Sequence, residues 1–216
     1  YTKAIELYEK AIELKPDYVS VYNNLGNAYE KQDNYTKAIE LYEKAIELKP
    51  DYALAYNNLG IVYKDQGDYT KAIDYYSRSL KTSEEIGDKK GIAGTLVNIG
   101  MICLQKGDYA KGIEYCTRSL KISNQISYKV GIGESLSVSG LIYKKQGNHS
   151  KAIDHYTRSL KIREEIGDKN GIAASLNNIG LIYKNQGNYA KAIDYYTKSL
   201  KIQEEIGYKK GIAYSL

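Results

Sequence analysis

The sequence predicts an all-α protein, an α-solenoid of antiparallel helix pairs, on three observations. Residues 1–18 recur letter for letter at residues 35–52, which sets a period of 34 residues. Farther along the chain the period lengthens to 40, marked by recurrent glycines at Gly60, Gly100, Gly140 and Gly180. Within each copy the apolar residues recur at helical spacing. Periods of this size are typical of solenoids, in which each unit buries its apolar face by stacking on its neighbours.

Each copy begins with a predicted helix whose apolar residues share one face. In the first complete copy these residues are Tyr22, Leu25, Gly26 and Tyr29. Their offsets of three, four and seven define one face of a helix with 3.6 residues per turn. Because Gly26 and the small Ala38 of the next helix lack bulk, the two helices of a pair can approach closely.

A second helix is predicted in each copy. In the first copy it begins after Asn34, and its inner face carries Ala38, Tyr42 and Ala45. Pro50 stands just past its end, where proline cannot continue a helix. The large tyrosine of the second helix is expected to fill the space beside the small residues.

The two periods predict where the helix pairs and repeats lie. The pairs are expected at residues 19–32 with 35–48, 53–65 with 69–86, 93–105 with 109–126, 133–145 with 149–166, and 173–185 with 189–206. One array would then cover residues 1–216: a half repeat at 1–18, repeats at 19–52, 53–92, 93–132, 133–172 and 173–212, and the start of a truncated repeat at 213–216. Both ends fall inside a repeat, which predicts a fragment of a larger protein.

Together these residues resemble the tetratricopeptide repeat. The match runs position by position through Tyr22, Leu25, Gly26, Tyr29, Ala38, Tyr42, Ala45 and Pro50. Tyrosine stands where that family often has tryptophan or phenylalanine. The resemblance covers the whole chain, and it implies a right-handed superhelix whose first helices line a concave groove that binds a protein or peptide.

The longer repeats replace the proline by an extra helical turn and a glycine-rich corner. The corner reads EEIGDKKGIA at 84–93, EEIGDKNGIA at 164–173 and EEIGYKKGIA at 204–213. This form resembles repeat arrays of bacterial multidomain signalling proteins and of animal cell-polarity and motor-cargo adaptors.

Motifs and residue spacing favour a protein that is not an enzyme. His149 and His155 have no further ligand residues at metal-binding spacing, so no metal site is predicted. Cys103 and Cys116 stand where sister repeats carry tyrosine, which predicts core positions rather than a disulfide or a nucleophile. No phosphate-binding glycine motif and no catalytic constellation occur, and no cofactor is expected.

Charge and hydropathy narrow the class of partner. No apolar run approaches the roughly 18 to 20 residues of a membrane span, and no secretory leader occurs, which predicts a cytoplasmic protein without membrane contact. Residues 1–66 hold 8 Lys and Arg against 11 Asp and Glu, whereas residues 67–216 hold 23 against 15. No sustained basic stripe is interleaved with exposed aromatic residues, which disfavours nucleic acid as a partner.

The first feature of the predicted peptide-binding groove is a row of asparagines. Two residues before the recurrent glycines stand Asn24, Asn58, Asn98 and Asn178, and Val138 interrupts the row. In several tetratricopeptide arrays the equivalent amides bond to the backbone of an extended peptide, because an amide offers both a donor and an acceptor. The alternative is that these amides only solvate the groove or bond locally.

Apolar and basic residues complete the predicted site. The residues one position after each glycine are Asn27, Ile61, Met101, Leu141 and Leu181. Four or five positions after the glycines stand Lys31, Lys64, Lys144, Lys145 and Lys184. Such a groove suits an extended ligand with apolar side chains and some acidic residues.

One subtype of the family is disfavoured. Members that bind chaperone tails use Lys or Arg three residues before the glycine to clamp a terminal carboxylate. Here those positions hold Asn23, Asn57, Val97, Ser137 and Asn177. The sequence therefore argues against a carboxylate clamp.

The sequence favours a non-catalytic scaffold for protein–protein interaction, part of a larger signalling or adaptor protein. One alternative is a structural module that self-associates head to tail through uncapped ends, since its acidic first third and basic remainder are complementary. Another is the regulatory sensor array of a larger enzyme.

Overall fold

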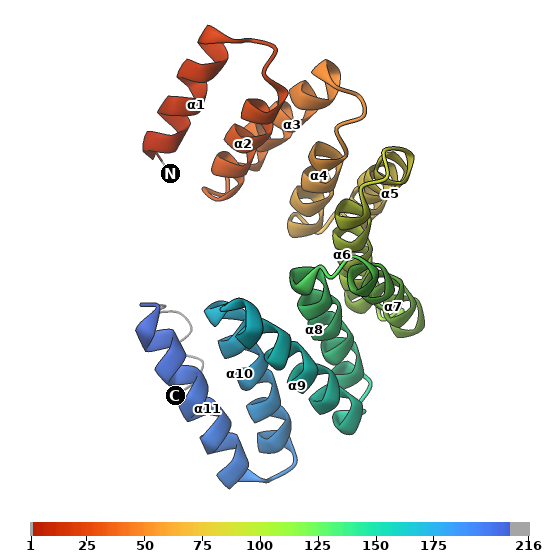
Figure 1. Ribbon diagram of the computed structural model, residues 1–216, viewed down its shortest axis with the longest axis vertical. Coiled ribbons are helices and arrows are strands. Elements are labelled where there is room, and N and C mark those ends of the chain that lie inside the picture. The colour runs from red at the N-terminus through yellow and green to blue at the C-terminus, as the bar shows by residue number, and fades with distance from the viewer. Residues whose placement is uncertain (1, 208–216) are drawn as a thin grey trace. The chain divides into compact units, whose positions relative to one another are not determined.

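A computed structural model describes residues 2–207, and in that range the chain forms helices joined by short turns, with no strand. In chain order (Figure 1) the helices are α1 (Thr2–Leu14), α2 (Val19–Glu30), α3 (Tyr35–Leu48), α4 (Ala53–Asp65), α5 (Tyr69–Glu85), α6 (Lys89–Lys106), α7 (Tyr109–Gln125), α8 (Lys129–Lys145), α9 (His149–Ile166), α10 (Lys169–Asn185) and α11 (Tyr189–Glu205). The predicted all-α class is confirmed.

The helices belong to two compact units, which divide within α6: unit 1 is Tyr1–Ile102 and unit 2 is Cys103–Leu216. In unit 1 each helix from α1 to α5 packs on the next, and in unit 2 the same holds from α7 to α11 (Figure 1). Because the connections are only two to four residues long, neighbouring helices run antiparallel. Each unit is therefore a stack of helix hairpins, as predicted for a helical solenoid.

The second helices share one way of starting. An Asn or Asp at the N-cap accepts a hydrogen bond from the backbone N–H three residues later, which satisfies an otherwise unpaired donor. These caps are Asn34, Asp68, Asp108, Asn148 and Asn188. The residue that donates is a lysine in every case.

The first helices of the long repeats begin earlier than predicted. α6, α8 and α10 start four residues before the expected positions 93, 133 and 173. Before α6 the turn is confined to Ile86, Gly87, whose φ is +71°, and Asp88, which accepts the N–H of Gly91. Gly91 lies inside the helix, and a Cβ there would press on the Asp88 and Ser83 side chains. The second glycine of the corner therefore permits close packing instead of forming the turn.

In each unit the recurrent glycine of a first helix packs under the tyrosine of the second helix. A Cβ at Gly26 would lie 2.6 Å from Cε1 of Tyr42, and one at Gly140 would lie 2.8 Å from Cε1 of Tyr156. Both tyrosines are almost fully buried. The predicted close approach of the two helices is confirmed.

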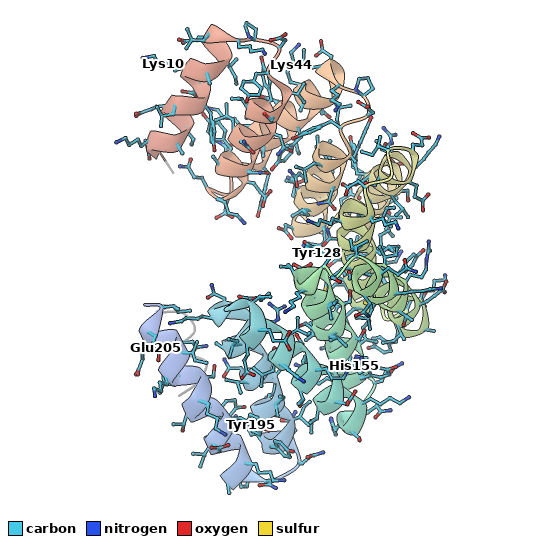
Figure 2. The ribbon with its side chains drawn as sticks, in the orientation of Figure 1. Lys10, Lys44, Tyr128, His155, Tyr195 and Glu205 are labelled. Carbon is cyan, nitrogen blue, oxygen red and sulfur yellow. The ribbon has the colours of Figure 1, made fainter. Side chains whose placement is uncertain are left out.

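Aromatic and basic side chains also pack in layers along the hairpins. The Tyr63 and Tyr75 rings stack with centroids 5.3 Å apart, and Lys71 and Arg78 lie over their outer faces. Tyr183 and Tyr195 repeat the stack at 5.6 Å, and Tyr143 and His155 make a tilted version at 5.0 Å. Figure 2 labels His155 on α9 and Tyr195 on α11. These ring pairs join α4 to α5, α8 to α9 and α10 to α11.

Candidate peptide-binding surface

The candidate site lies on one side of the first helices. On each helix it includes a residue three positions before the recurrent glycine and the residues four and seven positions after that one. We call it the first-helix face. In unit 1 it comprises Asn23, Asn27 and Glu30 of α2 and Asn57, Ile61 and Lys64 of α4; in unit 2 it comprises Ser137, Leu141 and Lys144 of α8 and Asn177, Leu181 and Lys184 of α10. Residues at this spacing share one face of a helix.

An amide network joins α4 to the face residues of α2. Asn58 is 7% exposed, and its Nδ2 donates to Oδ1 of Asn23 at 2.8 Å and to Oδ1 of Asn27 at 3.0 Å. Asn58 is therefore not an open position of a groove, although it belongs to the predicted row of asparagines. Tertiary packing between successive first helices buries it, and its amide bonds within the protein.

The remaining asparagines of unit 1 differ from one another. Asn98 is half-buried, and its Nδ2 donates to Oδ1 of Asn57 at 3.0 Å, which ties α6 to α4. Asn24 is exposed to solvent. Asn58 and Asn98 thus make the local bonds that the sequence left open as an alternative, whereas Asn24 keeps a free surface position.

In unit 2 a lysine replaces the asparagine partner. Lys144 donates from Nζ to Oδ1 of Asn178 at 2.8 Å, and Asn178 donates to the carbonyl of Ala174. Burial, together with the charge of the adjacent Lys145, lowers the pKa of Lys144. The structure therefore brings together Asn178 and Lys144, two residues that the sequence proposed separately.

The other predicted lysines lie in different environments. Lys64 pairs with Asp65 at 3.1 Å, so its charge is compensated within α4. Lys145 and Lys184 are exposed at the C-terminal ends of α8 and α10. A ligand carboxylate would therefore find more uncompensated positive charge on unit 2 than beside Lys64.

The predicted apolar residues keep part of their surface accessible. Ile61, Met101 and Leu141 are half-buried, and Leu181 is 36% exposed. Sequence reasoning missed Leu54 of α4, which is 49% exposed. Exposed side chains of this size favour contact with an apolar ligand group.

Sequence reasoning also missed a buried arginine in unit 2. The Arg163 side chain of α9 is 16% exposed; it pairs with Asp168 and donates to the hydroxyls of Ser159 and Ser137 at 3.2 and 3.3 Å. Sister repeats hold Ser83, Ser123 and Gln203 at this position. A single charged residue at an otherwise uncharged repeat position was the available signal.

The chemistry of the described residues offers no activated nucleophile at the two cysteines. Cys103 and Cys116 are free thiols and buried, as predicted for core positions. Burial raises the pKa of Cys116 to about 12, which keeps it protonated at neutral pH. Among residues 2–207 no group of three His, Cys, Asp or Glu side chains is arranged to hold a metal ion. None of the described helices is long and apolar enough to cross a membrane.

The fold resembles several solved structures at low sequence identity. BtubC (BKLC) from P. vanneervenii aligns with a TM-score of 0.76 at 21% identity, covering 96% of this chain and 89% of that one. YrrB, described as a TPR protein with an unusual peptide-binding site, aligns with a TM-score of 0.54 at 21% identity, covering 93% and 94%. MamA aligns with a TM-score of 0.59 at 21% identity, covering 85% and 96%. No curated protein sequence matches the chain.

The family match spans nearly the whole described chain. The tetratricopeptide repeat model matches residues 1–51, 17–85, 51–94, 91–165 and 135–205. These matches agree with the helix hairpins and with the glycine and tyrosine contacts at their centres. The chain therefore belongs to the tetratricopeptide repeat family.

Proposed function

We propose that the protein is a non-catalytic scaffold whose first-helix face binds an extended peptide segment of a partner protein. The observation that carries the proposal is the combination on unit 2 of exposed Leu181, half-buried Leu141 and lysines without a carboxylate partner. Apolar contacts would supply affinity, and the amines would recognise acidic residues of the ligand. The fold shared with a tetratricopeptide protein whose structure is described by its peptide-binding site supports this use of the face.

The proposal extends to the parent protein and its cellular compartment. The array would be the interaction part of a bacterial signalling or adaptor protein in the cytoplasm. Two buried free thiols support a reducing compartment, because neither cysteine is in a disulfide.

Selection of a displayed library of random heptapeptides on the chain tests the proposal. Peptides should be enriched, and changing Leu141→Ala together with Leu181→Ala should abolish most of the enrichment. The matched control is Leu7→Ala with Leu14→Ala, two exposed leucines of α1 that lie outside the face. No enrichment, or equal loss in the control, would show that the face is not the binding site.

A second candidate function, head-to-tail self-association, rests on exposed apolar residues of α1 and α11. Leu7 and Leu14 are 61% and 80% exposed, and Ile193 and Tyr189 are 64% and 65% exposed. Two such surfaces, one in each unit, would form a heterologous contact. Light scattering over a concentration series decides this. The mass of the unmodified chain should rise above 24.3 kDa with concentration, and the mass of Ile193→Asp should remain at 24.3 kDa. A constant mass would remove this candidate.

A further inference from the structure

Residues of opposite charge on α8 lie beside and within the first-helix face of unit 2. Glu134 lies near the start of the helix, and Lys144 and Lys145 lie at its end. The face between them holds Ser137 and Leu141, at offsets that keep all these residues on one side of the helix. Sister repeats hold Leu54, Gly94 and Ala174 at the position of Glu134, so the charge pattern belongs to this repeat.

Glu134 is a half-buried carboxylate without a partner. It makes no hydrogen bond or ion pair with the part of the chain that the structure describes. Burial raises the pKa of Glu134, and the nearby charge of Arg163 offsets this only in part. Arg163 is already paired with Asp168. Because the Glu134 carboxylate has lost part of its hydration, a cationic group from a ligand would bind there favourably.

The C-terminal end of α8 carries two positive charges without a carboxylate partner among the described residues. Lys144 donates to the neutral amide of Asn178, and Lys145 raises the positive potential beside it. Within residues 2–207 neither of these two lysines forms a salt bridge with a carboxylate. A carboxylate from a ligand would relieve the repulsion between these neighbouring amines.

The spacing of the two charges fits a short extended peptide. Lys144 follows Glu134 by ten residues, about 15 Å along the helix axis. An extended peptide points alternate side chains to one side and rises about 3.3 Å per residue, so residues i and i+4 lie about 13 Å apart. The lengths of the side chains close the remaining gap. Half-buried Leu141 lies between the two charges, about 10.5 Å past Glu134 along the helix axis. Residue i+2 of the peptide lies about 6.6 Å past residue i, so the two apolar side chains must span about 4 Å along the axis.

We propose that unit 2 selects an extended peptide with a basic, an apolar and an acidic residue at positions i, i+2 and i+4. The peptide lies along α8, with its basic residue on Glu134, its apolar residue on Leu141 and its acidic residue on Lys144 and Lys145. This inference rests on the proposed function and specifies the ligand of that site.

The test sequences the peptides that a displayed library of random heptapeptides yields on the full chain. The unmodified chain should enrich the basic–x–apolar–x–acidic pattern, read in either chain direction. Glu134→Gln should remove the preference for the basic residue and keep that for the acidic one. Lys144→Gln with Lys145→Gln should do the reverse. In fluorescence anisotropy, Glu134→Gln should weaken a selected labelled peptide about tenfold, the size expected when one close charge pair is lost.

Matched controls and the opposing outcomes make the test decisive. Glu164→Gln and Lys161→Gln change exposed charges of α9 and should leave the pattern unchanged. Peptides that require Leu141 and Leu181 but show no charge pattern would overturn this inference and leave the proposed function standing. A basic preference that persists in Glu134→Gln would also overturn it. A library that yields no enriched peptide would overturn both.

Discussion

The hairpins α2–α3 and α8–α9 bury a tyrosine against the same glycine position, yet only one of the two hydroxyls has a partner. The Tyr42 hydroxyl can donate to Oδ1 of Asn27 at 2.7 Å or to Oε2 of Glu30 at 3.0 Å. The Tyr156 hydroxyl is buried and makes no hydrogen bond with the described residues. The position of Asn27 in α2 is that of Leu141 in α8. The long repeat therefore has an apolar residue on the first-helix face where the short repeat has a hydrogen-bond acceptor.

The apolar residue in α8 lowers the stability of its hairpin but provides a surface that a ligand can contact. A buried polar group without a partner costs about 1 to 3 kcal/mol of folding free energy. The α8–α9 hairpin carries that cost at Tyr156, and Leu141 leaves part of its surface in contact with solvent. The α2–α3 hairpin instead uses Asn27 for its internal network. At this position the α8–α9 hairpin is thus less stabilised and more apolar than the α2–α3 hairpin, which is consistent with the proposed peptide-binding role of α8.

The packing of glycine under tyrosine is the shared part of the comparison, so its loss should have the largest effect in both hairpins. Gly26→Ala and Gly140→Ala would each push a Cβ into a tyrosine ring. Overpacking costs about 1 to 3 kcal/mol, and the better helix propensity of alanine offsets up to about 1. We expect each variant to lose about 2 kcal/mol in urea unfolding monitored by circular dichroism.

Gly94→Ala is the control for this pair. A Cβ there meets no atom within 4 Å, so only the propensity gain of about 0.5 to 1 kcal/mol should remain. Equal losses in all three variants would mean that the glycines act through the backbone and not through the tyrosine contact.

Two asparagines that bond to α2 and α8 from the next first helix should differ in their contribution to stability, by less than the loss expected for the glycine variants. Asn58→Ala would remove the donor to Oδ1 of the buried Asn23 and would leave Oδ1 of Asn27 with the Tyr42 hydroxyl alone, at a cost of about 1 to 2 kcal/mol. Asn178→Ala in unit 2 removes a half-buried amide that bonds to Lys144, and it should cost no more than about 0.5 kcal/mol. Thermal melting of both variants measures the difference. Equal effects would contradict the separate roles of the two asparagines.

The sequence predicted those parts of the fold that depend on local pattern. The 34- and 40-residue periods, the contact of Gly26 with Tyr42 and the core positions of the two cysteines all follow from periodicity and residue size. The corner was misread because two glycines four residues apart look alike in sequence. Gly87 adopts positive φ, whereas Gly91 permits close packing inside a helix.

Partners across helices could not be predicted in the same way. Asn58 bonds to Asn23, 35 residues earlier, and no local pattern reveals which side chain of a neighbouring helix an amide will face. Arg163 departs from its sister positions, a signal that the sequence reasoning did not use, and its pairing with Asp168 depends on how α9 meets α10. Helix register therefore assigned the predicted site residues to the first helices, but it could not give their hydrogen-bond partners.

Removing the two hydroxyls tests the opening comparison directly. Tyr42→Phe deletes a satisfied donor and should cost about 1 kcal/mol. Tyr156→Phe deletes a hydroxyl without a partner and should be neutral or slightly stabilising, since the buried group no longer loses its hydration. Urea midpoints of the two variants give the comparison. A loss at Tyr156 as large as at Tyr42 would imply an ordered water or another partner for its hydroxyl.

The smallest expected effect concerns a contact that both hairpins share. Lys37 lies over the Tyr29 ring at 4.8 Å and Lys151 over the Tyr143 ring at 5.2 Å. Exposed cation–π contacts contribute about 0.5 to 1 kcal/mol, so Lys37→Met and Lys151→Met should each lower stability by about 0.5 kcal/mol. Methionine keeps an unbranched side chain of similar length, and the backbone N–H that bonds to the N-cap residue is unchanged. The substitution therefore mainly removes the charge. Lys161→Met of α9, an exposed lysine, is the control and should have no measurable effect. If Lys161→Met lowers the melting temperature as much as the other two, net charge and not the aromatic contact accounts for the loss.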